Sequence, residues 1–378
     1  MVALYPNRGL AFVRGAGAYL FTRDGTRYLD LMTNYGASLL GHGHSVVTAA
    51  LAEQLSRLVT MHGSFGSDIR ARASIALAGR LPIREAGLCW LNSGTEAIEA
   101  ALKFASLATG RRRFVASAGA YHGKTLGALS VTHAPKYRAL FDGLGWPVDH
   151  VAFGSAAAVD AAITADTAAV IVEPIQGESG IVVPPDGYLR QLREICSARR
   201  VVLIVDEIQT GCGRTGVFTE SEREGVEPDI LCLGKGLAGG VPVGVTAVSP
   251  AIAERLARGV HTSTFGGNPL AATGVLATLS VVTPDLLERV DRIGREWRAR
   301  LAAIETDRIT EVRGRGLMVG VAVPSGRDQI LKDLQKEGVL AIPAGEDVIR
   351  FLPPLIVSPE QLEEGAEALI RVLTGANS

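Results

Sequence analysis

Short apolar runs alternate with helical stretches along the first two thirds of the chain. Such runs are typical of strands buried on both faces, and stretches such as 95–108 and 187–199 are predicted as helices that cover them. The predicted strands are residues 88–91, 113–116, 168–172, 201–205, 230–233 and 243–248. The pattern predicts an α/β fold with a mostly parallel central sheet and helices on both faces.

The pattern changes near residue 270, where long amphipathic helices such as 286–304 begin. At 378 residues the chain is long enough for one large domain and a smaller one. We expect a large domain over 46–270 and a smaller α+β domain over 271–378. Residues 1–45 contain the strand-like pieces 10–13 and 19–22, and we expect them to pack with the smaller domain.

Composition narrows the function classes. The net charge is -1 and no long basic run occurs, which disfavours nucleic-acid binding. No stretch is typical of a membrane span, and the N-terminus lacks an export signal. The four cysteines are far apart and the seven histidines form no pattern of metal ligands, so we expect reduced thiols, no metal site and a cytoplasmic location.

One lysine stands out chemically. Lys235 lies between two glycines, after a strand, and the acidic pair Asp206-Glu207 closes the strand before it. An amine in an apolar turn can lose its proton and act as a Schiff-base nucleophile, and an aspartate at a strand end can hold a proton on a heterocyclic nitrogen. Together these residues suggest a site for pyridoxal phosphate.

A phosphate site is predicted where the strand 88–91 runs into the next helix. The helix N-terminus near Gly94 and Thr95 would offer N–H groups and a positive dipole end, and the hydroxyls of Ser93 and Thr95 would add donors. Alternatively, Ser93 only caps the helix. Because the phosphate site, Asp206 and Lys235 all lie at strand ends, we expect them to face one crevice.

Two nucleotide-binding motifs fit less well. Residues 211–216 read G-x-G-x-x-G, but no apolar-periodic helix follows them, so a NAD-dependent oxidoreductase is disfavoured. The glycines around Lys235 lack the spacing and the Ser or Thr of a P-loop.

Seven motifs in order resemble those of the class III pyridoxal phosphate-dependent aminotransferases, and they span nearly the whole chain. They are Ser93-Gly-Thr-Glu-Ala97, Tyr121-His-Gly123, Val172-Glu-Pro-Ile-Gln-Gly-Glu178, Asp206-Glu-Ile-Gln-Thr-Gly211, Gly234-Lys-Gly236, Thr262-Ser-Thr-Phe-Gly-Gly-Asn-Pro269 and Arg313-Gly-Arg-Gly-Leu317. The resemblance implies fold type I of the pyridoxal phosphate enzymes. Within the family the chain is most similar to the acetylornithine and ornithine group, including enzymes that act on carrier-bound lysine or ornithine.

The resemblance also implies roles at the cofactor. Lys235 would hold the cofactor as a Schiff base and shuttle a proton, and Asp206 would keep the pyridine nitrogen protonated. The other implied contacts to the ring are Tyr121 and Ile208 on its two faces, Gln209 at its phenolic oxygen, and His122 nearby. Gly94, Thr95 and Ser93 would hold the phosphate.

Further roles imply a homodimer and a two-substrate site. Thr264 would reach the phosphate from the partner subunit. Arg350 would clamp the α-carboxylate of glutamate, and Glu178 would pair with Arg350 while the ω-amine donor is bound. The partners implied are 2-oxoglutarate and glutamate, the amino donor, and in one variant an amino-group carrier protein.

Two positions depart from the acetylornithine pattern. Lys124 stands where these enzymes usually carry an arginine that holds a distal carboxylate, and lysine keeps the charge without the bidentate geometry. A lysine there resembles putrescine aminotransferases. Tyr35 falls where ornithine aminotransferases place a tyrosine that contacts the α-amino end.

The sequence therefore predicts a transaminase that moves the terminal amino group of an acetylornithine/ornithine- or lysine-like donor to 2-oxoglutarate. The alternatives are a putrescine or γ-aminobutyrate aminotransferase, an aminomutase or decarboxylating transaminase of the same fold, and a non-catalytic binding protein. The last would be expected to lack Lys235 or Asp206.

Overall fold

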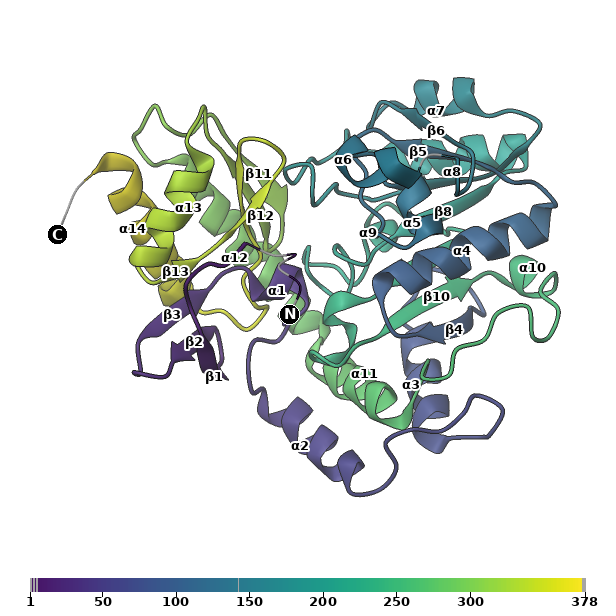
Figure 1. The fold of residues 1–378 in the computed structure, drawn as a ribbon, viewed down its shortest axis with the longest axis horizontal. Helices are drawn as coiled ribbons and strands as arrows, with labels where there is room; N and C mark the ends of the chain where they lie inside the picture. Colours follow the sequence, from purple (N-terminus) through teal and green to yellow (C-terminus); the bar gives the residue numbers. More distant parts are fainter. Residues whose placement is uncertain (1, 3, 5, 142, 376–378) are drawn as a thin grey trace.

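The computed structural model describes residues 2, 4, 6–141 and 143–375. The chain forms a large lobe around a seven-stranded sheet and a smaller lobe that contains two four-stranded sheets (Figure 1). The purple N-terminal strands lie beside the yellow-green C-terminal elements, although the two segments are far apart in the sequence.

The central sheet has the strand order β4-β10-β9-β8-β7-β5-β6. The strands are β4 (Gly87–Leu91), β5 (Arg113–Ser117), β6 (Val148–Val151), β7 (Thr167–Val172), β8 (Val202–Asp206), β9 (Ile230–Leu233) and β10 (Gly244–Val248). All neighbours pair in parallel except β10, which runs antiparallel to both β4 and β9. The predicted fold class is confirmed, although the sequence did not reveal the direction of β10.

Helices cover both faces of this sheet. Phe114 of β5 packs in the cluster of α4 (Gly94–Thr109), whereas its neighbour Val115 packs in the cluster of α8 (Tyr188–Arg199). Successive strand residues point to opposite faces, so the two helices lie on opposite sides. The predicted helices 95–108 and 187–199 correspond to α4 and α8. Strand β6 was missed because its sequence, Val-Asp-His-Val, places two polar residues at a half-buried edge.

The remaining helices are α2 (Ser45–Leu55), α3 (Asp68–Ala78), α5 (Leu126–Val131), α6 (Pro135–Arg138), α7 (Ala156–Ala162), α9 (Glu220–Arg223), α10 (Pro250–Ala253), α11 (Pro269–Val281), α12 (Pro284–Ala302), α13 (Arg327–Lys336) and α14 (Pro359–Thr374), with short 3₁₀ turns η1 (Ala139–Phe141) and η2 (Lys235–Ala238). Among the described residues no single helix has the length and apolar composition to cross a membrane; only α11 and α12 together meet that test, as a pair bent by 70°.

The smaller lobe joins the two ends of the chain. One of its sheets has the order β1 (Phe12–Ala16), β2 (Tyr19–Thr22), β3 (Arg27–Asp30) and β13 (Val339–Leu340), and the other has the order β11 (Glu311–Arg315), β12 (Met318–Ala322), β15 (Val348–Phe351) and β14 (Ile342–Ala344). Strand β3 pairs in parallel with β13. This pairing supports the expected packing of residues 1–45 with the C-terminal part, while the domain boundaries near 45 and 270 stay a prediction.

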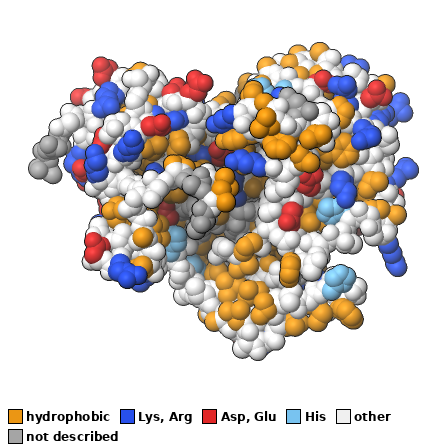
Figure 2. Space-filling model, viewed as in Figure 1, with side chains coloured by type: hydrophobic (Ala, Val, Ile, Leu, Met, Phe, Trp, Pro, Cys, Tyr) orange, Lys and Arg blue, Asp and Glu red, His pale blue; other side chains and the backbone are white. Residues whose placement is uncertain are grey.

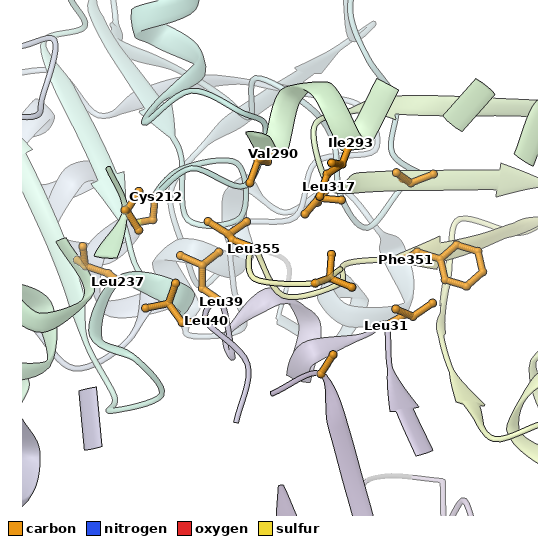
Figure 3. Packing of buried hydrophobic residues seen from close by; sticks show 14 of the residues in the cluster. Leu31, Leu39, Leu40, Cys212, Leu237, Val290, Ile293, Leu317, Phe351 and Leu355 are labelled. Carbon is orange, nitrogen blue, oxygen red and sulfur yellow. The ribbon is translucent and has the colours of Figure 1, made fainter. Parts of the chain in front are cut away.

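A buried hydrophobic core joins the two lobes (Figure 3). Leu31 and Leu39 from the N-terminal segment lie in one cluster with Leu237 of the large lobe and Leu355 of the C-terminal part. Leu39 approaches the chain so closely that a Cβ on Gly236 would lie 2.6 Å from its Cβ. The N-terminal segment therefore packs directly on the turn that carries Lys235.

The acidic pair at the end of β8 points two ways. Glu207 is fully buried away from the cavity that Asp206 lines, and it accepts hydrogen bonds from the Thr210 hydroxyl at 2.5 Å and from Ser221 N at 2.8 Å. Burial raises the pKa of Glu207 to about 7, although these hydrogen bonds oppose the shift. Glu207 therefore organises the chain between β8 and α9.

The raised pKa of Glu207 predicts a pH-dependent stability. The contribution of Glu207 to the free energy of unfolding is complete below its pKa in the unfolded chain, about 4.3. This contribution is lost as the pH rises through the pKa in the folded chain, about 7, because the buried carboxyl then has to ionise. Replacing Glu207→Gln removes this titration, so the stability of the variant relative to wild type should rise by up to about 3 kcal/mol between pH 5 and pH 8, by linkage. Urea unfolding at several pH values measures the difference. The exposed Glu305→Gln is the control, and a pH-independent difference for Glu207→Gln would contradict the assignment.

Candidate active site

A cavity of about 280 Å³ opens where the strands of the central sheet end. Asp206 closes β8, Lys235 follows β9, and Tyr121 comes from the loop after β5. Ten of the predicted site residues line it: Gly94, Thr95, Tyr121, His122, Lys124, Glu178, Asp206, Ile208, Gln209 and Lys235. The start of α4, Asp206 and Lys235 thus face one crevice, as expected, while the roles of the individual residues stay predictions.

Asp206 is fixed by two hydrogen bonds. His122 Nδ1 lies 2.7 Å from Asp206 Oδ2, and Ile208 N donates to Asp206 Oδ1 at 3.0 Å. Burial would lower the pKa of His122, but the hydrogen bond and charge of Asp206 outweigh it and raise the pKa. The two hydrogen bonds thus fix the Asp206 carboxylate, the kind of group that can hold a proton on a ring nitrogen.

Lys235 opens the short turn η2 with a positive φ of 44°. Burial lowers the pKa of its amine, while the charges of Glu178 and Asp206 oppose this effect. A lowered pKa increases the fraction of neutral amine, which is the nucleophilic form. The position thus combines a half-buried amine with a strained backbone, as functional sites often do.

The N-terminus of α4 faces the cavity. Gly94 is required there, because a Cβ would lie 2.9 Å from two side-chain carbons of Ile208. Ser93 is the N-cap, since its hydroxyl accepts a hydrogen bond from Glu96 N at 3.3 Å. The capping role of Ser93 is therefore observed, and its contact with a phosphate stays a prediction. Thr95 Oγ1 lies 2.8 Å from Thr125 Oγ1, and this hydrogen bond holds the Thr95 hydroxyl at the start of α4.

Glu178 and Arg350 form a pair at the wall of the cavity. Arg350 Nη1 donates to Glu178 Oε1 at 2.8 Å and to Gln209 Oε1 at 3.2 Å, and the arginine is fully buried. Burial alone would raise the pKa of Glu178, but the guanidinium of Arg350 outweighs it and lowers the pKa. Tyr35 covers this pair from outside, with its ring centroid 5.3 Å from Arg350 Cζ.

Lys124 stands between the cavity and an outer groove. Its Nζ lies 4.5 Å from the centroid of the Tyr137 ring, a cation–π geometry. The groove of about 550 Å³ is lined in part by Tyr35, Lys136 and Tyr137. Thr264 is exposed and does not line the cavity within this one chain, so its predicted contact across a dimer stays a prediction.

Glu173 lies in the cavity but was not predicted as a site residue from the sequence. It directly follows β7, lines the cavity and is 7% exposed, and Tyr121 N donates to its carboxylate at 3.0 Å. Burial raises the pKa of Glu173 to about 7, although His122 opposes the shift. The sequence signal was present, because Glu173 occupies the same strand-end position in β7 that Asp206 occupies in β8.

The residues of the cavity fit pyridoxal phosphate. An ionisable carboxylate, a half-buried amine and the N-terminus of a sixteen-residue helix meet in one space. These groups match the cofactor's ring nitrogen, aldehyde and phosphate, respectively.

Comparisons with known proteins agree with this fit. Residues 4–373 match the family described as "Aminotransferase class-III". The chain is 43% identical over 374 residues to an acetylornithine aminotransferase of Methanopyrus kandleri, which covers 98% of this chain and 95% of that protein. It is 40% identical over 372 residues to a [LysW]-aminoadipate semialdehyde/glutamate semialdehyde transaminase of Sulfolobus acidocaldarius, covering 98% and 96%.

Solved structures give the same assignment. An ornithine aminotransferase from Toxoplasma gondii, described with partial occupancy of pyridoxal phosphate at its active site, superposes with a TM-score of 0.94 at 32% identity, covering 99% of this chain and 92% of that one. An acetylornithine aminotransferase from Elizabethkingia anophelis gives 0.88 at 31% identity, covering 99% and 96%. The chain therefore belongs to the class III aminotransferases and is an enzyme whose cofactor is pyridoxal phosphate.

Proposed function

We propose that the chain is a transaminase that moves the terminal amino group of an acetylornithine/ornithine- or lysine-like donor to 2-oxoglutarate. The products are a semialdehyde and glutamate. One observation carries this proposal: the cavity that holds Lys235 and Asp206 is also bounded by Glu178, whose partner is the buried Arg350.

Each residue of the cavity has a task in this reaction. When bound, pyridoxal phosphate accepts the amino group and disperses the negative charge that develops on the substrate carbon. Asp206, fixed by His122, holds the proton on the ring nitrogen, and the N–H groups at the start of α4 bind the phosphate. Lys235 Nζ anchors the cofactor and afterwards accepts and returns the proton of the substrate carbon.

Glu178 and Arg350 let one cavity serve two substrates. In the observed pair the positive charge of Arg350 is matched by Glu178, an arrangement suited to a donor whose reacting end is an amine without a carboxylate. When Glu178 moves away, Arg350 can clamp the α-carboxylate of glutamate or 2-oxoglutarate with two parallel hydrogen bonds.

We also propose that the enzyme is a homodimer with shared sites. Large apolar side chains are exposed on and near α2 and on the loop that carries Thr264; they are Val46, Leu55, Leu58, Val59, Phe65 and Phe265. Figure 2 shows hydrophobic side chains gathered over α2 and α11 on the face shown. Burial of this surface against a second copy would bring the partner's Thr264 to the phosphate end of the site.

The groove beside Lys124 bears on the identity of the donor. The relatives named above act on acetylornithine or on a LysW-bound semialdehyde, so a free or carrier-bound donor fits the groove beside Lys124. Lys124 itself favours a second candidate, a putrescine aminotransferase, because lysine lacks the bidentate geometry of arginine and putrescine has no carboxylate to be clamped. An aminomutase would form no glutamate, which separates it from both.

The role of Lys235 predicts a covalent link to the cofactor. Borohydride reduction of the holoenzyme, followed by peptide mass mapping, should place the cofactor on Lys235. Lys235→Ala should lose the link and lower glutamate formation by about a thousandfold or more, because the proton carrier is lost as well. Lys136→Ala, which removes an exposed amine of the outer groove, is the control. Modification of another lysine would refute the assignment.

The position of Lys124 predicts how donors are selected. If its amine binds a distal carboxylate, Lys124→Ala should lower kcat/KM for acetylornithine by about tenfold to a hundredfold, the worth of one charge-assisted hydrogen bond, and leave putrescine within about twofold. Lys124→Arg should restore acetylornithine. Rates are measured for the donor half-reaction, with glutamate as product after 2-oxoglutarate is added. If wild type prefers putrescine and Lys124→Ala changes all donors equally, the acetylornithine-type assignment fails.

A further inference from the structure

Residues 33–36, which carry Tyr35, have an unusual backbone. Thr33, Asn34 and Tyr35 have φ values of 41°, 49° and 57°, and Gly36 follows with 88°. The segment that Figure 1 labels α1 (Thr33–Gly36) is therefore a single left-handed turn and not an α-helix. Left-handed backbone costs about 1–2 kcal/mol for each non-glycine residue, so it persists only where its surroundings hold it.

The carboxylate of Asp30 holds this turn at its start. Asp30 Oδ1 accepts hydrogen bonds from Met32 N at 3.1 Å and from Thr33 N at 2.8 Å. Its other oxygen, Oδ2, lies 2.8 Å from His42 Nε2, so the carboxylate is fixed from both sides. Asp30 is 2% exposed and ends β3, where Leu340 of β13 pairs with it.

A second anchor ties the turn to the strand that carries Arg350. The hydroxyl of the buried Thr33 donates to Leu352 O at 2.6 Å, and Leu352 N donates to Leu31 O at 2.6 Å. Leu352 lies two residues after Arg350. The turn and the arginine are thus held in one hydrogen-bonded frame.

The frame places the Tyr35 ring beside the guanidinium of Arg350, 5.3 Å from its Cζ. Tyr35 is 42% exposed, and it lines the outer groove, whereas Arg350 is fully buried. Within the described chain Arg350 Nε has no hydrogen-bond partner, and Nη1 bonds to Glu178 and Gln209. When Glu178 leaves, the aromatic face remains to steady the planar cation.

We propose that Asp30 is a positioning residue for the carboxylate-binding half of the reaction. It acts through the left-handed turn and Tyr35, which orient Arg350 for the α-carboxylate of glutamate or 2-oxoglutarate. The inference rests on the proposed function, in which Arg350 binds that carboxylate. It predicts that the damage from breaking the turn falls on one half-reaction, whereas a purely structural role of Asp30 would affect both.

The experiment compares the two half-reactions of the holoenzyme by rapid kinetics. Asp30→Ala should raise the apparent Kd for glutamate about tenfold and leave kcat/KM for putrescine within about twofold, because putrescine has neither a carboxylate for Arg350 nor an α-amino end that could contact Tyr35. Asp30→Asn keeps an acceptor for Met32 N and Thr33 N and should recover most of the affinity. In the double variant with Tyr35→Ala, Asp30→Ala should add nothing to the loss caused by Tyr35→Ala alone.

A milder variant covers the case in which Asp30→Ala does not fold. His42→Gln removes only the outer support of the carboxylate and should weaken glutamate binding about threefold, again without effect on the donor. Equal losses in both half-reactions, or unchanged glutamate binding in a folded Asp30→Ala enzyme, would overturn the inference while leaving the proposed function intact. A wild-type enzyme that makes no glutamate from any donor would instead reject the proposed function, and this inference with it.

Discussion

The packing of Leu39 against Gly236 is the contact on which the site depends. It presses the N-terminal segment onto the turn that starts at Lys235 and leaves no room for a side chain at position 236. The same segment reaches the C-terminal strands through Leu31 and Thr33. Three stretches that are distant in sequence are thereby held in fixed positions around one cavity.

The ionisable groups of the cavity depend on one another. Burial alone would favour the neutral forms of His122 and Glu178, but the charges of Asp206 and Arg350 outweigh it and shift the pKa of each toward the charged form. For Lys235 and Glu173 burial is the dominant effect. It lowers the pKa of the amine and raises the pKa of the carboxyl, so both shifts favour the uncharged form. Groups shifted toward the charged form and groups shifted toward the neutral form thus line one cavity, as acid–base chemistry on a single substrate carbon requires.

Much of this could be predicted from sequence, because strand ends are local features. Apolar runs placed six of the seven central strands, and the polar residues just after them led to Asp206, Lys235 and Gly94. Other features could not be predicted, because they depend on backbone geometry and strand pairing that exist only in the folded chain. No local sequence pattern indicates the role of the Asp30 carboxylate or the direction of β10. For the left-handed turn the only local indication is Asn34, because asparagine adopts a positive φ more often than most residues. Likewise, the sequence showed Asp206 and Glu207 as one acidic pair, and only the folded strand separates the residue of the cavity from the residue of the core.

The pairing of β3 with β13 sets the order in which the protein can be completed during synthesis. Leu29 is synthesised 310 residues before its partner Val339. Until then one edge of the sheet formed by β1, β2 and β3 stays unpaired. This sheet is therefore completed only after the central sheet of the large lobe has been synthesised, and over that interval the open edge of β3 is a surface on which another chain could pair.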